Sequence, residues 1–172
     1  ASRILGNVLL SQGYDVKVSE VHGMSQRGGS VVTYIKFGEK VYSPVIEKGQ
    51  ADIIVSFEAL EAARWVSFLK KGGKLVMNTQ EIEPMPVITG AAQYPANIVD
   101  TLKSLGEDVI AVDALSLAEQ AGTSRAVNVV LMGVISHILD FGDKVWNDAL
   151  EQCVPAKVLE VNKKAFGLGR NA

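Results

Sequence analysis

The chain has 172 residues, of which 48% are hydrophobic and 21% are charged, with a formal net charge of −2 at pH 7. These values are typical of one folded domain over residues 1–172 and exclude a disordered chain. Without a basic excess there is no electrostatic footprint for nucleic acid. No apolar run reaches the roughly 18 residues that a membrane span needs, and no secretory signal opens the chain, so we expect a cytoplasmic protein without membrane contact.

The chain contains a single cysteine, Cys153. It therefore cannot supply the four thiolates of an iron–sulfur cluster or a structural zinc site. Trp146 and Leu150 precede it at helical spacing, which predicts a buried, small apolar residue. A catalytic thiol is the weaker interpretation because neither histidine is near it in sequence.

The first part of the chain predicts one helix and three strands. Apolar residues at helical spacing predict a helix over residues 2–10, which the glycine at position 13 would end. Residues 15–21 and 30–37 alternate as strands do, and residues 41–46 read as a returning strand after a tight turn. Pro44 would place that last strand at a sheet edge, because proline cannot donate to the ladder.

A strand–helix–strand unit follows. A nearly continuous apolar run predicts a buried strand over residues 51–57, followed by a helix over 58–69 that Gly72 and Gly73 end. Residues 74–79 form the next predicted strand. Such a unit implies a right-handed crossover and a parallel pair of strands.

The remaining elements continue the alternation. We expect a short strand at 87–88 inside a Pro-rich connection, a strand at 108–113, helices at 96–105, 116–121, 125–139, 143–152 and 155–166, and a fraying tail from Gly167. The helix over 125–139 carries a wide apolar stripe and should be largely buried. The predicted fold class is α/β: a three-layer α/β/α sandwich with a mixed, mostly parallel sheet plus a β-hairpin insertion.

The connection between the first two predicted strands is longer and more polar than a hairpin turn requires. It contains His22, Gly23, Met24, Ser25, Gln26, Arg27, Gly28 and Gly29. Glycines permit close approach of another group, and the guanidinium of Arg27 suits a carboxylate or a phosphate. One interpretation is a binding loop, and the other is a surface loop in which Arg27 makes a structural salt bridge.

Two further candidates follow strand ends. Glu58 and Asn78 lie at the carboxyl ends of neighbouring parallel strands, where ligands bind in open α/β sheets. The structural alternatives are a charge that suits the helix dipole at the start of the helix for Glu58 and a loop-capping amide for Asn78, and these are the more common roles. The sequence offers no nucleophile–base pair, metal cluster or spaced carboxylate pair, so we assign no catalytic and no metal-binding residue.

The sequence also carries a resemblance to a known family. The segments HGMSQRGGSVVTYIKFGEKVYSPVI and ADIIVSFEALEAARW, with GGKLVMNT, RAVN and EVNKKAF, resemble the gamma-type domain of the 2-oxoacid:ferredoxin oxidoreductases. The similarity is greatest to the indolepyruvate branch and covers nearly the whole chain. Family members open with a strand and a Gly-x-Gly-Gly-Gln-Gly loop before the first helix, and that segment is absent from this chain.

The resemblance implies a subunit that is inactive alone. Enzymes of the family oxidatively decarboxylate a 2-oxoacid, here indolepyruvate or another aryl pyruvate, to an acyl-CoA and pass electrons to ferredoxin. Thiamine diphosphate, magnesium and iron–sulfur clusters are expected in a larger partner subunit, with CoA as co-substrate. The loop from Met24 to Gly29 would then lie at the partner interface. The alternatives are a pyruvate or 2-oxoglutarate specificity, or a stand-alone nucleotide- or ligand-binding module.

Overall fold

The computed structural model describes residues 1–20 and 31–172. Its strands are β1 Asp15–Glu20, β2 Thr33–Gly38, β3 Ala51–Ser56, β4 Leu69–Asn78 and β5 Asp108–Val112. Its helices are α1 Ser2–Ser11, α2 Ala59–Trp65, α3 Met85–Ile88, α4 Ile98–Ser104, α5 Ala114–Ala121, α6 Val127–Ile138, α7 Asp143–Cys153 and α8 Leu159–Arg170. Within these described ranges, no helix is both long and apolar enough to cross a membrane.

The central sheet is parallel, with the order β3–β4–β5. Its middle strand separates two apolar cores because side chains alternate between the faces of a strand. Leu75 and Met77 point into one core, and Val76 points into the other. All three side chains are fully buried.

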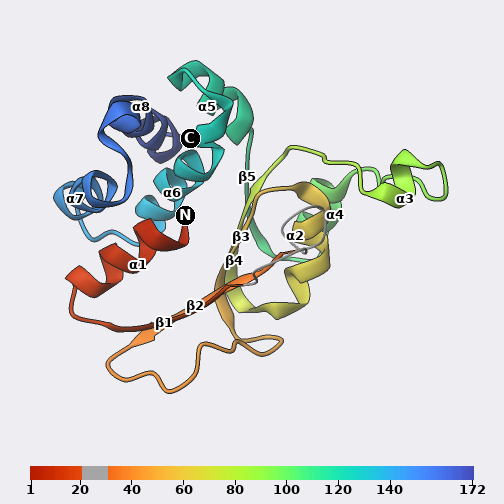
Figure 1. The fold of residues 1–172 in the computed structure, drawn as a ribbon. Helices are drawn as coiled ribbons and strands as arrows, with labels where there is room; N and C mark the ends of the chain where they lie inside the picture. Colours follow the sequence, from red (N-terminus) through yellow and green to blue (C-terminus); the bar gives the residue numbers. More distant parts are fainter. Residues whose placement is uncertain (21–30) are drawn as a thin grey trace.

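Helices cover both faces of this sheet (Figure 1). On one face, α2 and α4 bury small and branched residues against Leu75 and Met77. On the other face, α1, α5, α6, α7 and α8 all contribute to the larger core, and α6 packs directly against β4. The predicted three-layer α/β/α class is confirmed.

The antiparallel part of the fold differs in detail from the prediction. β1 and β2 pair with each other, with Val16 opposite Phe37 and Val18 opposite Ile35. Among the described residues they form a separate two-stranded sheet. The predicted returning strand over residues 41–46 is wrong, because that segment is irregular.

Local side-chain hydrogen bonds replace ladder bonds in the segment 41–46. The amide of Val41 donates to Oδ2 of Asp15 at 2.9 Å, and the amide of Val45 donates to Oγ of Ser43 at 3.2 Å. Pro44 has no amide hydrogen to offer. Side-chain acceptors of this kind compete with strand pairing, so the chain turns here instead of extending a sheet.

Two other predicted elements also change. The predicted strand at 87–88 is wrong and is part of the short helix α3, which Pro84 and Pro86 begin, since proline suits a first helical turn. Gly72 and Gly73 lie inside β4 and do not end α2. The register between β3 and β4 shifts there, and an added Cβ at Gly73 would lie 2.9 Å from the carbonyl oxygen of Asp52.

The predicted fraying tail is wrong as well, because α8 continues to Arg170. A Cβ at Gly169 would lie only 1.9 Å from the carbonyl oxygen of Val130, and one at Gly133 would lie 2.2 Å from that of Phe166. The two glycines thus let α6 and α8 cross with their backbones in near contact. The guanidinium of Arg170 donates to Oγ of Ser136 at 3.3 Å and holds the end of the helix.

Candidate functional site

The carboxyl ends of β3, β4 and β5 meet at one edge of the sheet. Backbone hydrogen bonds connect the segments that follow these strands. The amide of Thr79 donates to the carbonyl of Val112 at 3.0 Å, and the amide of Ala59 donates to the carbonyl of Gln80 at 3.0 Å. This is the edge at which parallel α/β sheets bind ligands. The two predicted residues Glu58 and Asn78 both lie at it.

Glu58 is buried and caps the first turn of α2. Its Oε2 accepts from the amide of Glu61 at 2.8 Å, which satisfies a donor that the helix itself leaves free. Its Oε1 accepts from the amide of Ile82 at 3.2 Å and from the hydroxyl of Tyr94. The carboxylate therefore joins three segments of the chain that are far apart in sequence.

Tyr94 completes this network. Its hydroxyl donates to Glu58 and accepts from the amide of Leu60 at 3.1 Å. Tyr94 is not among the residues predicted from the sequence, because a tyrosine inside a Pro-rich connection has no spacing relation to a strand end. Only the return of that connection to α2 brings the ring to Glu58.

Burial and hydrogen bonding act in opposite directions on the Glu58 carboxyl. Burial by itself raises its pKa, but the hydrogen bonds from Tyr94 and from the amides of Glu61 and Ile82 outweigh this, and the pKa is lowered. Burial and the neighbouring carboxylate raise the pKa of Tyr94 well above its usual value. At neutral pH the pair is one fixed acceptor and one fixed donor. It is not a proton shuttle.

Asn78 has no solvent exposure. Its Nδ2 donates to the carbonyl of Phe57 at 3.1 Å and to Oε1 of Gln80 at 3.3 Å, and its Oδ1 accepts from the amide of Ala114 at 3.1 Å. The amide thus links the ends of β3 and β4 to the start of α5. These hydrogen bonds are the ones expected if Asn78 is a structural, loop-capping amide. A ligand contact by Glu58 or Asn78 stays a prediction.

The Gly-rich loop is the remaining candidate. His22, Gly23, Met24, Ser25, Gln26, Arg27, Gly28 and Gly29 lie outside the described residues. The strands on either side of the loop are described, and Glu20 is the pairing partner of Thr33.

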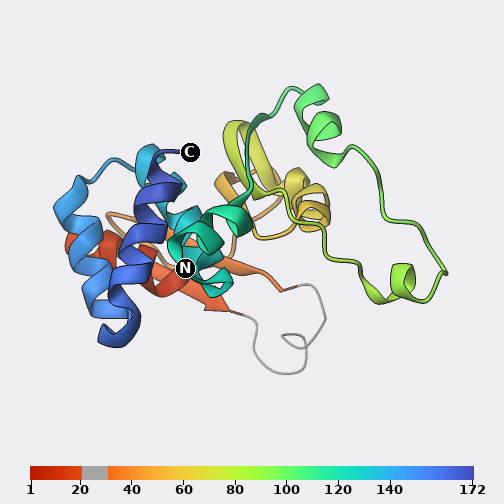
Figure 2. The same ribbon diagram turned by 90° about the horizontal axis from the view of Figure 1, so that it is seen from above.

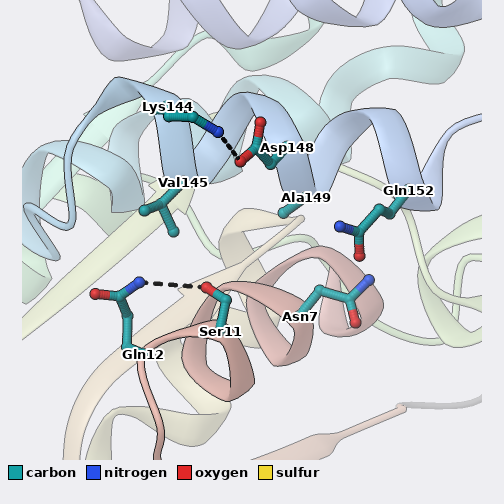
Figure 3. A pocket seen from close by; sticks show the side chains of 8 residues that line it. All are labelled: Asn7, Ser11, Gln12, Lys144, Val145, Asp148, Ala149 and Gln152. Carbon is teal, nitrogen blue, oxygen red and sulfur yellow. Dashed lines mark hydrogen bonds and ion pairs between the residues drawn. The ribbon is translucent and has the colours of Figure 1, made fainter.

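A small cavity of about 280 Å³ lies between α1 and α7, away from the strand ends (Figure 3). Asn7, Ser11 and Gln12 face it from α1 and its C-cap, and Lys144 and Asp148 face it from α7. Lys144 is paired with Asp148 at 2.6 Å, and Gln12 donates to Ser11 at 3.3 Å. Since these polar groups bind one another, the cavity shows no convergent set for a ligand.

A larger cavity of about 800 Å³ lies at the amino-terminal end of α1, and Ala1 is part of its wall. Its charged lining side chains are Arg3, Arg125 and Lys157, which favour an anion over a metal ion. Cys153 also lines it and is half-buried, not buried as predicted; its sulfur accepts from Nδ2 of Asn7 at 3.0 Å. In the part of the chain that the structure describes, no three His, Cys, Asp or Glu side chains gather as metal ligands do.

Comparison with known proteins matches the whole chain. The profile of the family described as "Pyruvate ferredoxin/flavodoxin oxidoreductase" covers residues 1–172. Indolepyruvate oxidoreductase subunit IorB of Thermococcus kodakarensis is 42% identical over 179 residues, which covers 100% of this chain and 88% of that protein. The subunits of the same name from Pyrococcus horikoshii and Archaeoglobus fulgidus are 41% and 35% identical.

Solved structures share the fold at lower identity. The gamma subunit of a keto/oxoacid ferredoxin oxidoreductase from Geobacter sulfurreducens is 19% identical, with a TM-score of 0.67 over 98% of this chain and 86% of that chain. A pyruvate oxidoreductase subunit from Thermotoga maritima gives 0.69 at 19% identity over 99% and 86%. The 2-oxoglutarate:ferredoxin oxidoreductase from Magnetococcus marinus gives 0.71 at 16% identity, over 98% of this chain and 27% of that longer chain.

Proposed function

This chain belongs to the pyruvate ferredoxin/flavodoxin oxidoreductase family, and from that premise we propose that it is the small subunit of an indolepyruvate:ferredoxin oxidoreductase. The observation that carries the proposal is the 42% identity to an indolepyruvate oxidoreductase subunit across all of this chain. The pyruvate and 2-oxoglutarate enzymes match at 19% identity or less, and so support the fold but not their substrates. No observation favours a stand-alone ligand-binding module.

The reaction we assign to the assembled enzyme is oxidative decarboxylation of an aryl pyruvate to an acyl-CoA, with electrons passed to ferredoxin. Enzymes of this family use thiamine diphosphate and iron–sulfur clusters, which supply the decarboxylation and electron-transfer chemistry. The residues of this chain do not fit the clusters, because it has one cysteine and four thiolates are needed. We therefore place the clusters in a larger partner subunit, and we propose that thiamine diphosphate and magnesium are bound there as well.

The role we assign to this chain is binding and positioning. Glu58, Tyr94 and Asn78 use their hydrogen bonds within the chain and keep the three strand ends in a fixed arrangement. The loop from His22 to Gly29 is our proposed contact with the partner or with a ligand, and its support is its composition of glycines and hydrogen-bonding side chains. Arg27 in this loop would pair with a phosphate, a carboxylate or an acid of the partner.

Reconstitution tests the proposal. The chain is mixed with a purified larger subunit that carries its cofactors, and CoA-dependent reduction of ferredoxin is followed with indolepyruvate, pyruvate or 2-oxoglutarate. We expect activity only when both subunits are present, with indolepyruvate the best substrate by kcat/KM. Oxidation of a 2-oxoacid by the chain alone would overturn the subunit role, and a preference for pyruvate or 2-oxoglutarate would overturn the substrate.

A further inference from the structure

The segment from Ile82 to Tyr94 is a loop closed on a single oxygen atom. The amide of Ile82 and the hydroxyl of Tyr94 both donate to Oε1 of Glu58. Loops whose ends meet in this way are compact units and often functional. We call the residues 82–94 the closed arm; it carries α3 and projects from the body of the molecule (Figures 1 and 2).

Hydrogen bonds within the closed arm give it a defined shape. The amide of Ala92 donates to the carbonyl of Pro86 at 2.9 Å, and Oγ1 of Thr89 donates to the carbonyl of Met85 at 3.0 Å. Pro84 and Pro86 restrict the backbone further. A segment ordered in this way before binding loses less entropy when it meets a partner.

The arm exposes large apolar side chains. Ile82 is 56% exposed, Met85 64% and Ile88 61%, all three within one short stretch of chain. Phe57, the residue before Glu58, is 42% exposed at the base of the arm. Single exposed apolar residues are ordinary, but several on a projecting, ordered segment mark an interaction surface.

The charge of the arm indicates the kind of surface that it fits. Glu81 and Glu83 flank Ile82, and no Lys, Arg or His occurs between Lys74 and Lys103. A second copy of this arm would bring like charges together, which disfavours pairing of two arms. A surface with an apolar depression and a rim of Lys or Arg would complement it.

We propose that the closed arm docks this chain onto the larger subunit of the oxidoreductase, with Met85 and Ile88 as apolar anchors. Glu83 in the arm and Glu81 directly before it would face a cationic rim. This inference rests on the proposed function, because it takes the larger subunit as the occupant. Glu58 and Tyr94 hold both ends of the arm and so fix its direction relative to the strand ends. The arm thereby places the carboxyl edge of the sheet against the partner.

The test measures binding of this chain to the purified larger subunit by titration calorimetry. The double variant Met85→Glu/Ile88→Glu puts charge on the apolar anchors, and we expect it to weaken binding at least about tenfold. The matched control is Leu105→Glu, which makes the same change at a side chain 62% exposed that lies outside the arm. All variants are first compared by circular dichroism and melting temperature, and we expect them to fold like the wild type.

Further outcomes distinguish a failure of the docking inference from a failure of the proposed function. Glu81→Gln/Glu83→Gln should make the binding less dependent on salt concentration, because the attraction between rim charges is screened by salt. If the wild-type chain binds the larger subunit and Met85→Glu/Ile88→Glu binds it with the same affinity, the inference is overturned and the proposed function still stands. No wild-type binding at all would overturn the proposed function, and the inference with it. A dimer of this chain alone that Met85→Glu/Ile88→Glu dissociates would reassign the arm to self-association and overturn the inference.

Discussion

The side chains of Glu58 and Tyr94 are hydrogen-bonded across 36 residues of sequence, with the phenol donating to Oε1 of the carboxylate. The bond joins the first turn of α2 to the end of the closed arm. Because the amide of Ile82 uses the same oxygen, one buried carboxylate fixes both ends of a projecting segment. The contact thus links the stability of the sheet edge to the presentation of the arm.

Removal of the Tyr94 hydroxyl tests that link. Tyr94→Phe removes the donor to Glu58 and leaves the amide of Leu60 without its acceptor. We expect a loss of about 1–3 kcal/mol in the free energy of unfolding, measured in urea, and faster proteolysis within residues 82–94. The control Tyr42→Phe removes the same atom from a residue that is 88% exposed, and should change stability by less than about 0.5 kcal/mol.

The pH dependence of stability follows from the lowered pKa of Glu58. The folded-state pKa lies below the ordinary value of 4.5, so the stabilisation is complete above that value and is lost as the pH falls through the folded pKa. Glu58→Gln should cost about 1.5–3 kcal/mol at pH 7 and flatten the acid limb of the stability curve. Unfolding in urea from pH 3 to 7 measures both effects. If the acid limb of Glu58→Gln is as steep as that of the wild type, the prediction is contradicted. The control is Glu119→Gln, which makes the same change at an exposed position.

Asp15 and Asp113 contribute to the same acid limb. Hydrogen bonds from Lys17 to Asp15 and from Ser116 to Asp113 lower the pKa of each carboxyl. The acid limb of Glu58→Gln should therefore be reduced but not abolished. On the alkaline side, the contribution of Tyr94 is complete below the ordinary tyrosine pKa, and it is lost as the pH rises from there through the raised pKa of the folded state.

Asn78 provides a test of the strand ends. Asn78→Asp keeps an acceptor for the amide of Ala114 but replaces the donor to the carbonyl of Phe57 with an oxygen, in a site without solvent. We expect a loss of at least about 2 kcal/mol at pH 7, with part of it recovered at acid pH when the new carboxyl is protonated. Asn147→Asp on the exposed side of α7 is the control. Equal melting temperatures for the two variants would rule out the assigned role.

The crossing of α6 and α8 predicts opposite effects for two glycines of one helix. Gly169→Ala would place a methyl group 1.9 Å from the carbonyl oxygen of Val130, so the helices must separate, and we expect a loss of more than about 3 kcal/mol or no folding. At Gly167 nothing lies within 4 Å of an added Cβ. Gly167→Ala should stabilise α8 by up to about 1 kcal/mol, because alanine is the better helix former. Thermal unfolding measures the stability of both variants. Equal changes in stability for Gly169→Ala and Gly167→Ala would refute the close crossing of α6 and α8.

Arg27 tests the Gly-rich loop in the reconstituted enzyme. If Arg27 pairs with a ligand, Arg27→Ala removes a charge-assisted hydrogen bond of roughly 1.5–3 kcal/mol, a loss of about 10- to 100-fold in kcat/KM. KM for the 2-oxoacid and for CoA, measured separately, shows which ligand is affected. Lys144→Ala removes an exposed cation of α7 and serves as the control. Unchanged values of KM together with unchanged assembly would eliminate a role for Arg27.

The repeating hydrophobic patterns of the sequence were sufficient to predict most of the elements that form the core. The strand–helix–strand unit of β3, α2 and β4 and the buried helix α6 follow from hydrophobic runs and periods, because burial on two faces or on one stripe needs those patterns. The patterns also placed Glu58 and Asn78 at one edge, since parallel strands end together. The family resemblance rested on segments distributed over the whole chain.

Local patterns could not determine features that depend on contacts between distant segments. A glycine looks the same in the sequence whether it ends a helix, lets β4 approach the backbone of β3 as Gly73 does, or lets α8 cross α6 as Gly169 does. The short apolar run that contains Ile88 pairs with no strand in the part of the chain that the structure describes, and it is helical. The pairing of Tyr94 with Glu58 exists only because the arm returns to α2, and a single chain position carries no record of what will fold against it.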